Sequence, residues 1–184
     1  MSFLSEGKEK EKTVSKLFDN VSFSNKNADI NEHWDFSSNG VKYDVKGLKK
    51  VKRDDAETNE FYHYIEIKNV NGDLGWLYGE AEFFLFETNK YWLVVDKKTL
   101  QDFIKNNITK TYVGNPDEAL YCLYKRSGRE DVITLITTID LMVIATEIKN
   151  KKSNIIEHTI GDSVIPEKRL KQRMSRIQLK KPNE

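Results

Sequence analysis

The chain has 184 residues, of which 38% are hydrophobic and 11% aromatic, and its formal net charge is +1. We expect one domain with a hydrophobic core, and because the charge is near zero, nucleic-acid binding would have to come from local basic patches. The single cysteine, Cys122, excludes an internal disulfide, and three histidines argue against a structural zinc site. The sequence has no apolar stretch long enough to cross a bilayer and its first residues lack a signal-peptide segment, so we expect the protein to act inside a cell.

The first predicted element is an amphipathic helix over residues 9–21. Its apolar side chains recur at helical spacing: Val14, Leu17, Phe18 and Val21. After a polar loop, residues 33–47 (HWDFSSNGVKYDVKG) predict a β-hairpin. The reason is the dipeptide Asn39-Gly40, which is the strongest short-range signal for a two-residue type I′ turn.

This turn sets the register of the hairpin and places Asp35 directly opposite Asp44. Alternation then puts Asp35, Asp44 and Lys46 on one charged face, together with His33, whose ring is expected to cap or pack. The apolar face should hold Trp34, Phe36, Val41, Tyr43 and Val45. Because like charges directly opposite each other destabilise a hairpin, we expect a positive group between the carboxylates, either Lys46 or a metal ion.

The later elements follow from local composition. We predict a strand over residues 61–70, apolar strands near 82–87 and 91–96, a helix over 99–107 and a helix from Asn115 through Tyr124. Residues 130–149 form a long apolar run whose Val, Ile and Thr content favours strand, although periodicity leaves helix open. Trp76 and Tyr78 are flanked by glycines, and we expect them to fill a core edge rather than stack on a base.

Four segments together resemble a known family: HWDF, VKYDVKG, YIEIKNVNG and GWLYGEAEFFLFE. They resemble a phage- and virus-associated group within the PD-(D/E)XK nuclease superfamily, over roughly residues 9–100 and onward to about 142. The resemblance implies an α/β fold of the restriction-endonuclease-like type, with a mixed central sheet flanked by helices. We expect a nuclease-like domain over residues 1–165, and the composition of residues 166–184 indicates a basic tail after it.

The resemblance carries over residue by residue. Asp35 matches the first acidic position, Asp44 and Lys46 match the (D/E)XK pair, and Glu66 matches an acid on the following strand. A second register stays open, in which Asp44 is the first acid and Glu66 and Lys68 form the (D/E)XK pair. We favour the first register because the hairpin places its residues on one face without a further assumption. No proline precedes Asp35, which departs from the family pattern.

These residue types suit phosphodiester hydrolysis. Asp35, Asp44 and Glu66 would bind Mg²⁺ or Mn²⁺, which act as Lewis acids and activate bound water. The catalytic lysine, Lys46 or in the other register Lys68, would orient the attacking water or contact the phosphate. A dense basic cluster follows the hairpin and would contact the DNA backbone: Lys49, Lys50, Lys52 and Arg53.

The expected function is therefore that of a Mg²⁺-dependent endonuclease that hydrolyses DNA, structure-specific or resolvase-like, in a bacterium or a virus-infected cell. DNA is the expected partner, and a homodimer is one expected assembly. The alternative is a non-catalytic nucleic-acid or protein binding module that keeps the nuclease scaffold.

Overall fold

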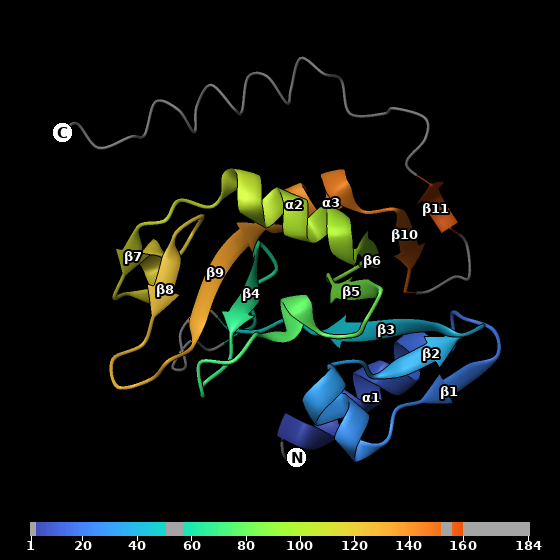
Figure 1. Ribbon diagram of the computed structural model, residues 1–184. Helices are drawn as coiled ribbons and strands as arrows, with labels where there is room; N and C mark the ends of the chain where they lie inside the picture. The colour runs from blue at the N-terminus through green and yellow to red at the C-terminus, as the bar shows by residue number, and fades with distance from the viewer. Residues whose placement is uncertain (1–2, 51–56, 152–155, 160–184) are drawn as a thin grey trace.

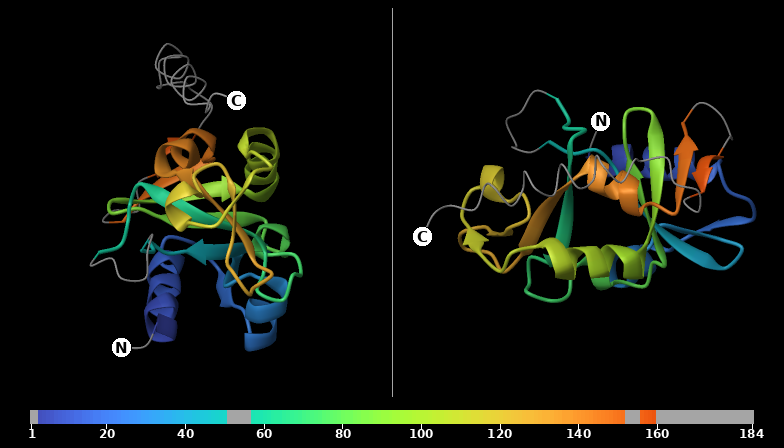
Figure 2. Two further views of the ribbon diagram at one scale, coloured as in Figure 1. Left: turned by 90° about the vertical axis from the view of Figure 1, so that its left-hand side faces the viewer. Right: turned by 90° about the horizontal axis from the view of Figure 1, so that it is seen from above.

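The structure is a computed structural model that describes residues 3–50, 57–151 and 156–159. Within these residues the strands form two sheets that lie next to each other, with helices on both faces of the larger sheet (Figure 1, Figure 2). The chain is therefore an α/β protein with a mixed sheet flanked by helices, as the sequence predicts. No helix within the described residues has the length and apolar character needed to span a membrane.

The larger sheet is mixed. In spatial order it contains β1 (Val21–Phe23), β2 (Phe36–Ser38), β3 (Val41–Lys46), β5 (Phe83–Glu87), β6 (Tyr91–Asp96), β10 (Glu147–Asn150) and β11 (Ile156–Thr159). β3 and β5 run parallel, whereas the flanking pairs described for this sheet are antiparallel.

The smaller sheet contains β4 (Tyr62–Lys68), β9 (Val132–Thr137), β8 (Leu123–Lys125) and β7 (Tyr112–Val113), in that spatial order. The α-helices are α1 (Phe3–Ser15), α2 (Lys97–Asn107) and α3 (Thr138–Ile144). Short helical turns are η1 (Ala28–Glu32), η2 (Trp76–Tyr78) and η3 (Pro116–Glu118).

Two hydrophobic clusters cover opposite faces of the larger sheet, because side chains alternate along β5. Phe84 and Phe86 belong to a cluster that includes Leu100 of α2 and Leu141 of α3. Leu85 belongs to the other cluster, which includes Val14 of α1 and these sheet residues: Phe36, Trp92 and Val94. Figure 1 shows the same division, with α2 and α3 above the sheet and α1 below it.

Several predicted elements are confirmed. The strand expected over residues 61–70 is β4, and the strands near 82–87 and 91–96 are β5 and β6. The helix expected over 99–107 is α2, which begins where the carboxylate of Asp96 accepts a hydrogen bond from the backbone N–H of Thr99 (2.8 Å).

The helix predicted over residues 9–21 is wrong in position. α1 ends at Ser15, Asn20 adopts a left-handed conformation with φ of 49°, and Val21 begins β1. The apolar residues after the helix, Leu17, Phe18 and Val21, still pack against the cluster that contains Val14. Their spacing therefore reflects burial on a common surface and not a continuous helix.

The helix predicted from Asn115 through Tyr124 is also wrong. Only η3 forms there, and Tyr121 has a φ of 57°, which ends helical geometry before β8. The run over residues 130–149 divides into β9, α3 and β10, and α3 begins at a capping box between Thr137 and Asp140. The predicted boundary between residues 165 and 166 lies outside the described residues.

Candidate functional site

The β2–β3 hairpin forms in the predicted register. Asn39 and Gly40 have φ angles of 50° and 85°, as a type I′ turn requires, and Phe36 pairs with Tyr43. Just before β2, the N–H of Asp35 donates to the carbonyl of Tyr43 (2.8 Å), and the N–H of Val45 donates to Asp35 Oδ2 (2.6 Å). These two bonds place the carboxyl group of Asp35 against the strand that carries Asp44.

Asp44 and Lys46 lie on the side of β3 that continues into the hydrophobic core. In the parallel pairing with β5, Asp44 aligns with Phe84 and Lys46 aligns with Phe86, so the paired side chains share a face. Asp44 is consequently only 4% exposed. The hairpin face that was predicted to be charged is therefore largely buried at Asp44.

The prediction that Trp34 lies on the apolar face of the hairpin is wrong. Trp34 was expected with Phe36 and Tyr43, but it packs against the cluster on the α2 and α3 side, and Lys42 Nζ lies 5.0 Å from its ring centre. The reason is that β2 begins only at Phe36, while His33 adopts a left-handed φ of 56°. Strand alternation therefore does not extend back to Trp34.

Asp44 and Lys46 form a buried ion pair. Asp44 Oδ2 lies 2.7 Å from Lys46 Nζ, but the pair lacks hydrogen-bond geometry, and among the described residues this oxygen has no hydrogen-bond partner. Lys46 Nζ also lies 4.2 Å from the ring centre of Trp76, which is 8% exposed. Trp76 thus fills a core edge, as predicted, and its ring contacts the lysine. The same prediction is wrong for Tyr78, which is 43% exposed.

The two aspartates repel each other. Burial and then the neighbouring carboxylate of Asp44 raise the pKa of Asp35 to about 8, against the opposing effect of the hydrogen bond from Val45. At neutral pH, Asp35 therefore stays largely protonated next to Asp44. The conflict between two carboxylates that the hairpin register predicts is therefore relieved in part by protonation of Asp35.

These groups line a cavity of about 500 Å³. Its walls come from α1, η1, the hairpin and η2, and its charged residues are Glu6, Lys10, Glu11, Asp29, Asp35, Asp44, Lys46 and Lys49. Burial and repulsion from Asp29, with a contribution from Asp44, raise the pKa of Glu11. Glu11 of α1 and Asp29 of η1 were not predicted, because charged residues in these segments carry no local signal that distinguishes a cavity wall from a solvated face.

Glu66 and Lys68 do not line this cavity. They lie on β4 of the smaller sheet, where Glu66 Oε2 accepts a long hydrogen bond from the N–H of Trp76 (3.4 Å) and Lys68 is exposed. The structure thus brings together Asp35, Asp44 and Lys46, and it leaves Glu66 and Lys68 outside. The roles assigned to Glu66 and Lys68 remain predictions.

The predicted basic cluster is described in part. Lys49 lines the cavity, where burial of its ammonium group and repulsion from Lys46 lower its pKa, although the residue as a whole is exposed. Lys50 is exposed outside the cavity lining. Lys52 and Arg53 lie outside the described residues.

Comparisons with protein-family models, with curated proteins and with solved structures find no match for this chain. In the part of the chain that the structure describes, no three His, Cys, Asp or Glu side chains form a group that could hold a metal ion. The donors that are present, the carboxyl groups of Asp35 and Asp44, are hard oxygen ligands of the kind that Mg²⁺ and Mn²⁺ prefer.

Proposed function

We propose that the chain is an endonuclease that hydrolyses DNA phosphodiester bonds at the cavity between α1 and the β2–β3 hairpin. It would depend on Mg²⁺, which Mn²⁺ could replace. The observation that carries the proposal is the opposition of Asp35 and Asp44 with Lys46 beside them. Burying two neighbouring carboxyl groups costs free energy, and such perturbed acids are concentrated at functional sites. The resemblance of the hairpin to the PD-(D/E)XK pattern supports the same function and suggests DNA as the substrate.

The residues present fit a hard divalent cation. Asp44 Oδ2 is a buried oxygen without a hydrogen-bond partner among the described residues, and burial together with the neighbouring carboxylate of Asp44 raises the pKa of Asp35. Mg²⁺ is commonly bound by one or two carboxylates, with water and substrate phosphate completing its shell. Asp35 and Asp44 would hold the ion, so a third protein ligand is not required. When bound, such an ion acts as a Lewis acid and lowers the pKa of coordinated water.

The protein's own residues supply the remaining chemistry. The ion pair with Asp44 and the ring of Trp76 restrict the ammonium of Lys46. A lysine fixed in this way can donate hydrogen bonds to a non-bridging phosphate oxygen and stabilise the negative charge that develops during attack. Lys49 lines the same cavity and would contact the neighbouring backbone phosphate.

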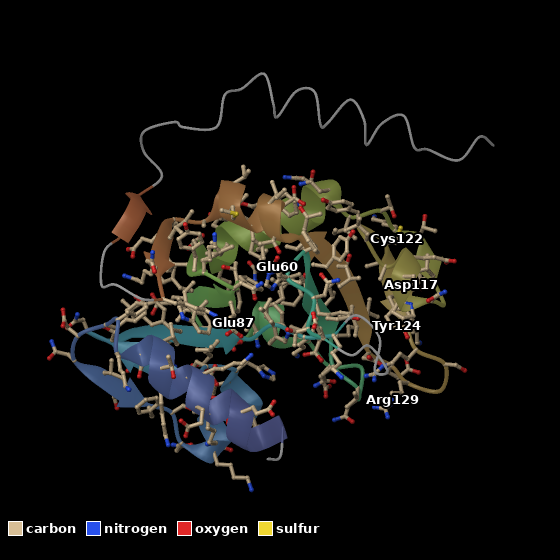
Figure 3. All side chains as sticks on the ribbon, turned by 180° about the vertical axis from the view of Figure 1, so that it is seen from behind. Glu60, Glu87, Asp117, Cys122, Tyr124 and Arg129 are labelled. Carbon is tan, nitrogen blue, oxygen red and sulfur yellow. The ribbon has the colours of Figure 1, made fainter. Side chains whose placement is uncertain are left out.

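A cleavage assay tests the proposal. Labelled duplex, flap, four-way junction and single-stranded DNA, with matched RNA, would be incubated with the wild-type protein and Mg²⁺ or Mn²⁺. We expect Asp44→Ala to remove cleavage while circular dichroism shows a retained fold. Asp117→Ala is the matched control, because Asp117 is exposed and Figure 3 shows it at the far end of the smaller sheet.

The outcomes separate the alternatives. Cleavage by the wild-type and Asp117→Ala proteins, lost in Asp44→Ala, supports a nuclease at this cavity. Binding of DNA without cleavage of any substrate would instead favour a non-catalytic binding module. If a well-folded Asp44→Ala protein cleaved DNA at the wild-type rate, the catalytic site could not lie at this cavity.

A further inference from the structure

Glu87 joins three segments that meet next to the candidate site. It lies at the end of β5, is 9% exposed, and Figure 3 shows it beside α1. Its Oε2 accepts hydrogen bonds from Lys10 Nζ (2.5 Å) and from the N–H of Leu48 (3.0 Å). Its Oε1 accepts one from Lys151 Nζ (2.7 Å). One buried carboxylate thus holds α1, the turn after β3 and the segment after β10.

Two of these partners are neighbours of site residues in the chain. Lys10 immediately precedes Glu11, and Leu48 follows Lys46 by two positions. Glu87 itself is outside the lining of the candidate cavity. It lines an adjoining cavity of about 340 Å³, which shares Glu6 and Lys10 with the first. Any effect of Glu87 on the site must therefore pass through Lys10 and the turn after β3.

Gly47 shows how closely α1 approaches this turn. A Cβ atom at Gly47 would lie 3.0 Å from both Cδ and Nζ of Lys10 and 3.3 Å from Glu87 Oε2. A side chain there would push Lys10 away from the backbone that directly follows Lys46. The missing side chain thus permits the contact among Lys10, Gly47 and Glu87.

The charge state of Glu87 suits this role. Burial alone would raise its pKa, but the hydrogen bonds from Lys10 and Lys151 and from the N–H of Leu48 outweigh it and lower the pKa. Hydrogen bonds between charged partners are about twice as strong as neutral ones. The carboxylate is therefore ionised at neutral pH and holds its partners over a broad pH range.

We propose that Glu87 is a positioning residue for the candidate site: its carboxylate fixes α1 against the end of β3, and so sets the placement of Lys46 and Glu11 across the cavity. The inference rests on the proposed nuclease function for its effect on rate, but the positioning itself is measurable without activity.

The test uses Glu87→Gln in the full chain, which keeps the side-chain shape and removes the charge. Glu130→Gln is the control, because Glu130 also pairs with a lysine, Lys125, at an exposed position away from the cavity. Three quantities would be measured: single-turnover cleavage, the Kd for DNA with Ca²⁺ in place of Mg²⁺, and hydrogen exchange of the segments 6–15 and 44–48.

We expect Glu87→Gln to slow single-turnover cleavage by about 10- to 100-fold, since small misplacements of catalytic groups have effects of this size. The Kd for DNA should change less than about threefold, and exchange should rise in both segments. Lys10→Met should have the same effects, and combining it with Glu87→Gln should add little, because both break the same link. Glu87→Asp should recover part of the rate.

Each outcome decides the inference. Unchanged exchange in both segments of Glu87→Gln overturns it, and so does cleavage at the wild-type rate. Equal effects in Glu130→Gln also overturn it, since the effect would then be general destabilisation. If the wild-type protein cleaves no substrate but hydrogen exchange rises in both segments of Glu87→Gln, the positioning role of Glu87 is supported. The proposed nuclease function is then overturned instead.

Discussion

Asp44 occupies a position where its strand neighbours carry apolar side chains. On β5, Asp44 pairs in register with Phe84 and Lys46 pairs with Phe86, and both phenylalanines are fully buried. Placing a carboxylate there costs free energy that a valine or leucine would not. The ion pair with Lys46 offsets this cost in part, and a bound cation would offset more. Buried acids that conflict with one another are more typical of functional sites than of structural positions.

Lys46 and Lys68 can be distinguished by rate. If Lys46 is the catalytic lysine, Lys46→Ala should lower single-turnover cleavage by about 10² to 10⁴, the range typical for loss of a positioned donor or general base. Lys68→Ala should change the rate little, because Lys68 lies exposed on β4 outside the cavity. The reverse ranking would move the catalytic motif to Glu66 and Lys68.

His63 should make the fold sensitive to acid. It is 4% exposed, Nε2 has no hydrogen-bond partner among the described residues, and burial lowers its pKa to about 4, against the opposing charge of Glu87. A depressed pKa means that the unfolded chain binds the proton first as pH falls. The contribution of His63 to stability is thus complete above about pH 6.5 and is lost towards pH 4, by up to about 3 kcal/mol.

The check is the free energy of unfolding in urea at pH 7.5 and 4.5. Wild-type protein should lose more stability between these values than His63→Leu, which cannot be protonated. Parallel pH dependence in the two proteins would show that burial of His63 does not control acid sensitivity.

At the scale of elements, the hairpin turn fixes the acid pair. Gly40 has a φ of 85°, and a Cβ there would meet nothing within 4 Å, so the cost of a side chain is conformational. We expect Gly40→Ala to lower the free energy of unfolding by about 1 to 2 kcal/mol, the cost of a left-handed alanine. It should also slow cleavage, because the turn aligns Asp35 with Asp44.

Gly114→Ala is the matched control. A Cβ at Gly114 also meets nothing within 4 Å, but its φ does not lie in the left-handed region. Thermal and urea unfolding of both variants would be compared with wild type. Equal stability of Gly40→Ala and Gly114→Ala would contradict the expected cost of a left-handed alanine in the turn.

The hairpin was predictable because its determinants are local. Asn39-Gly40 defines the turn, and the turn defines which residues of β2 and β3 face each other. The helix over residues 9–21 was not predictable in the same way, since Leu17 and Phe18 reach the core cluster of Val14 through a turn. Apolar spacing reports burial, and burial alone does not distinguish a helix from a loop that packs on the same surface.

The candidate site was predictable only where it lies within the hairpin. Glu11 and Asp29 join the cavity from α1 and η1, and no spacing rule connects them to Asp44. Glu66 was expected beside Asp44, but β4 belongs to the smaller sheet. Which sheet a strand joins depends on contacts between distant segments, which the sequence pattern does not encode.

At the scale of the whole molecule, charged residues of both signs gather around one cavity, although the net charge of the chain is only +1. Acids from α1, η1 and the hairpin gather on its walls, and lysines 10, 46 and 49 lie among them. This distribution would repel a phosphate backbone in the absence of a cation. If the chain binds DNA as proposed, the affinity must come in part from basic residues elsewhere in the chain.

The basic tail is the strongest candidate for that affinity, although it lies outside the described residues. Between positions 168 and 181 it contains no acid and these seven basic residues: Lys168, Arg169, Lys171, Arg173, Arg176, Lys180 and Lys181. Replacing all of them by glutamine in the full chain should weaken DNA binding most at low salt. Each lost phosphate contact should flatten the slope of log affinity against log salt by about 0.7 to 0.9.

Fluorescence anisotropy across a salt series measures that slope, with Lys98→Gln/Lys105→Gln on the exposed surface of α2 as the control. Single-turnover cleavage at saturating protein should stay nearly unchanged, because the proposed ligands Asp35 and Asp44 lie in the hairpin and do not need the tail. If the tail variant lost saturated cleavage, the tail would be part of the catalytic structure. If its slope matched the control, the tail would not contact phosphates, and Lys49 and its neighbours would have to supply the affinity.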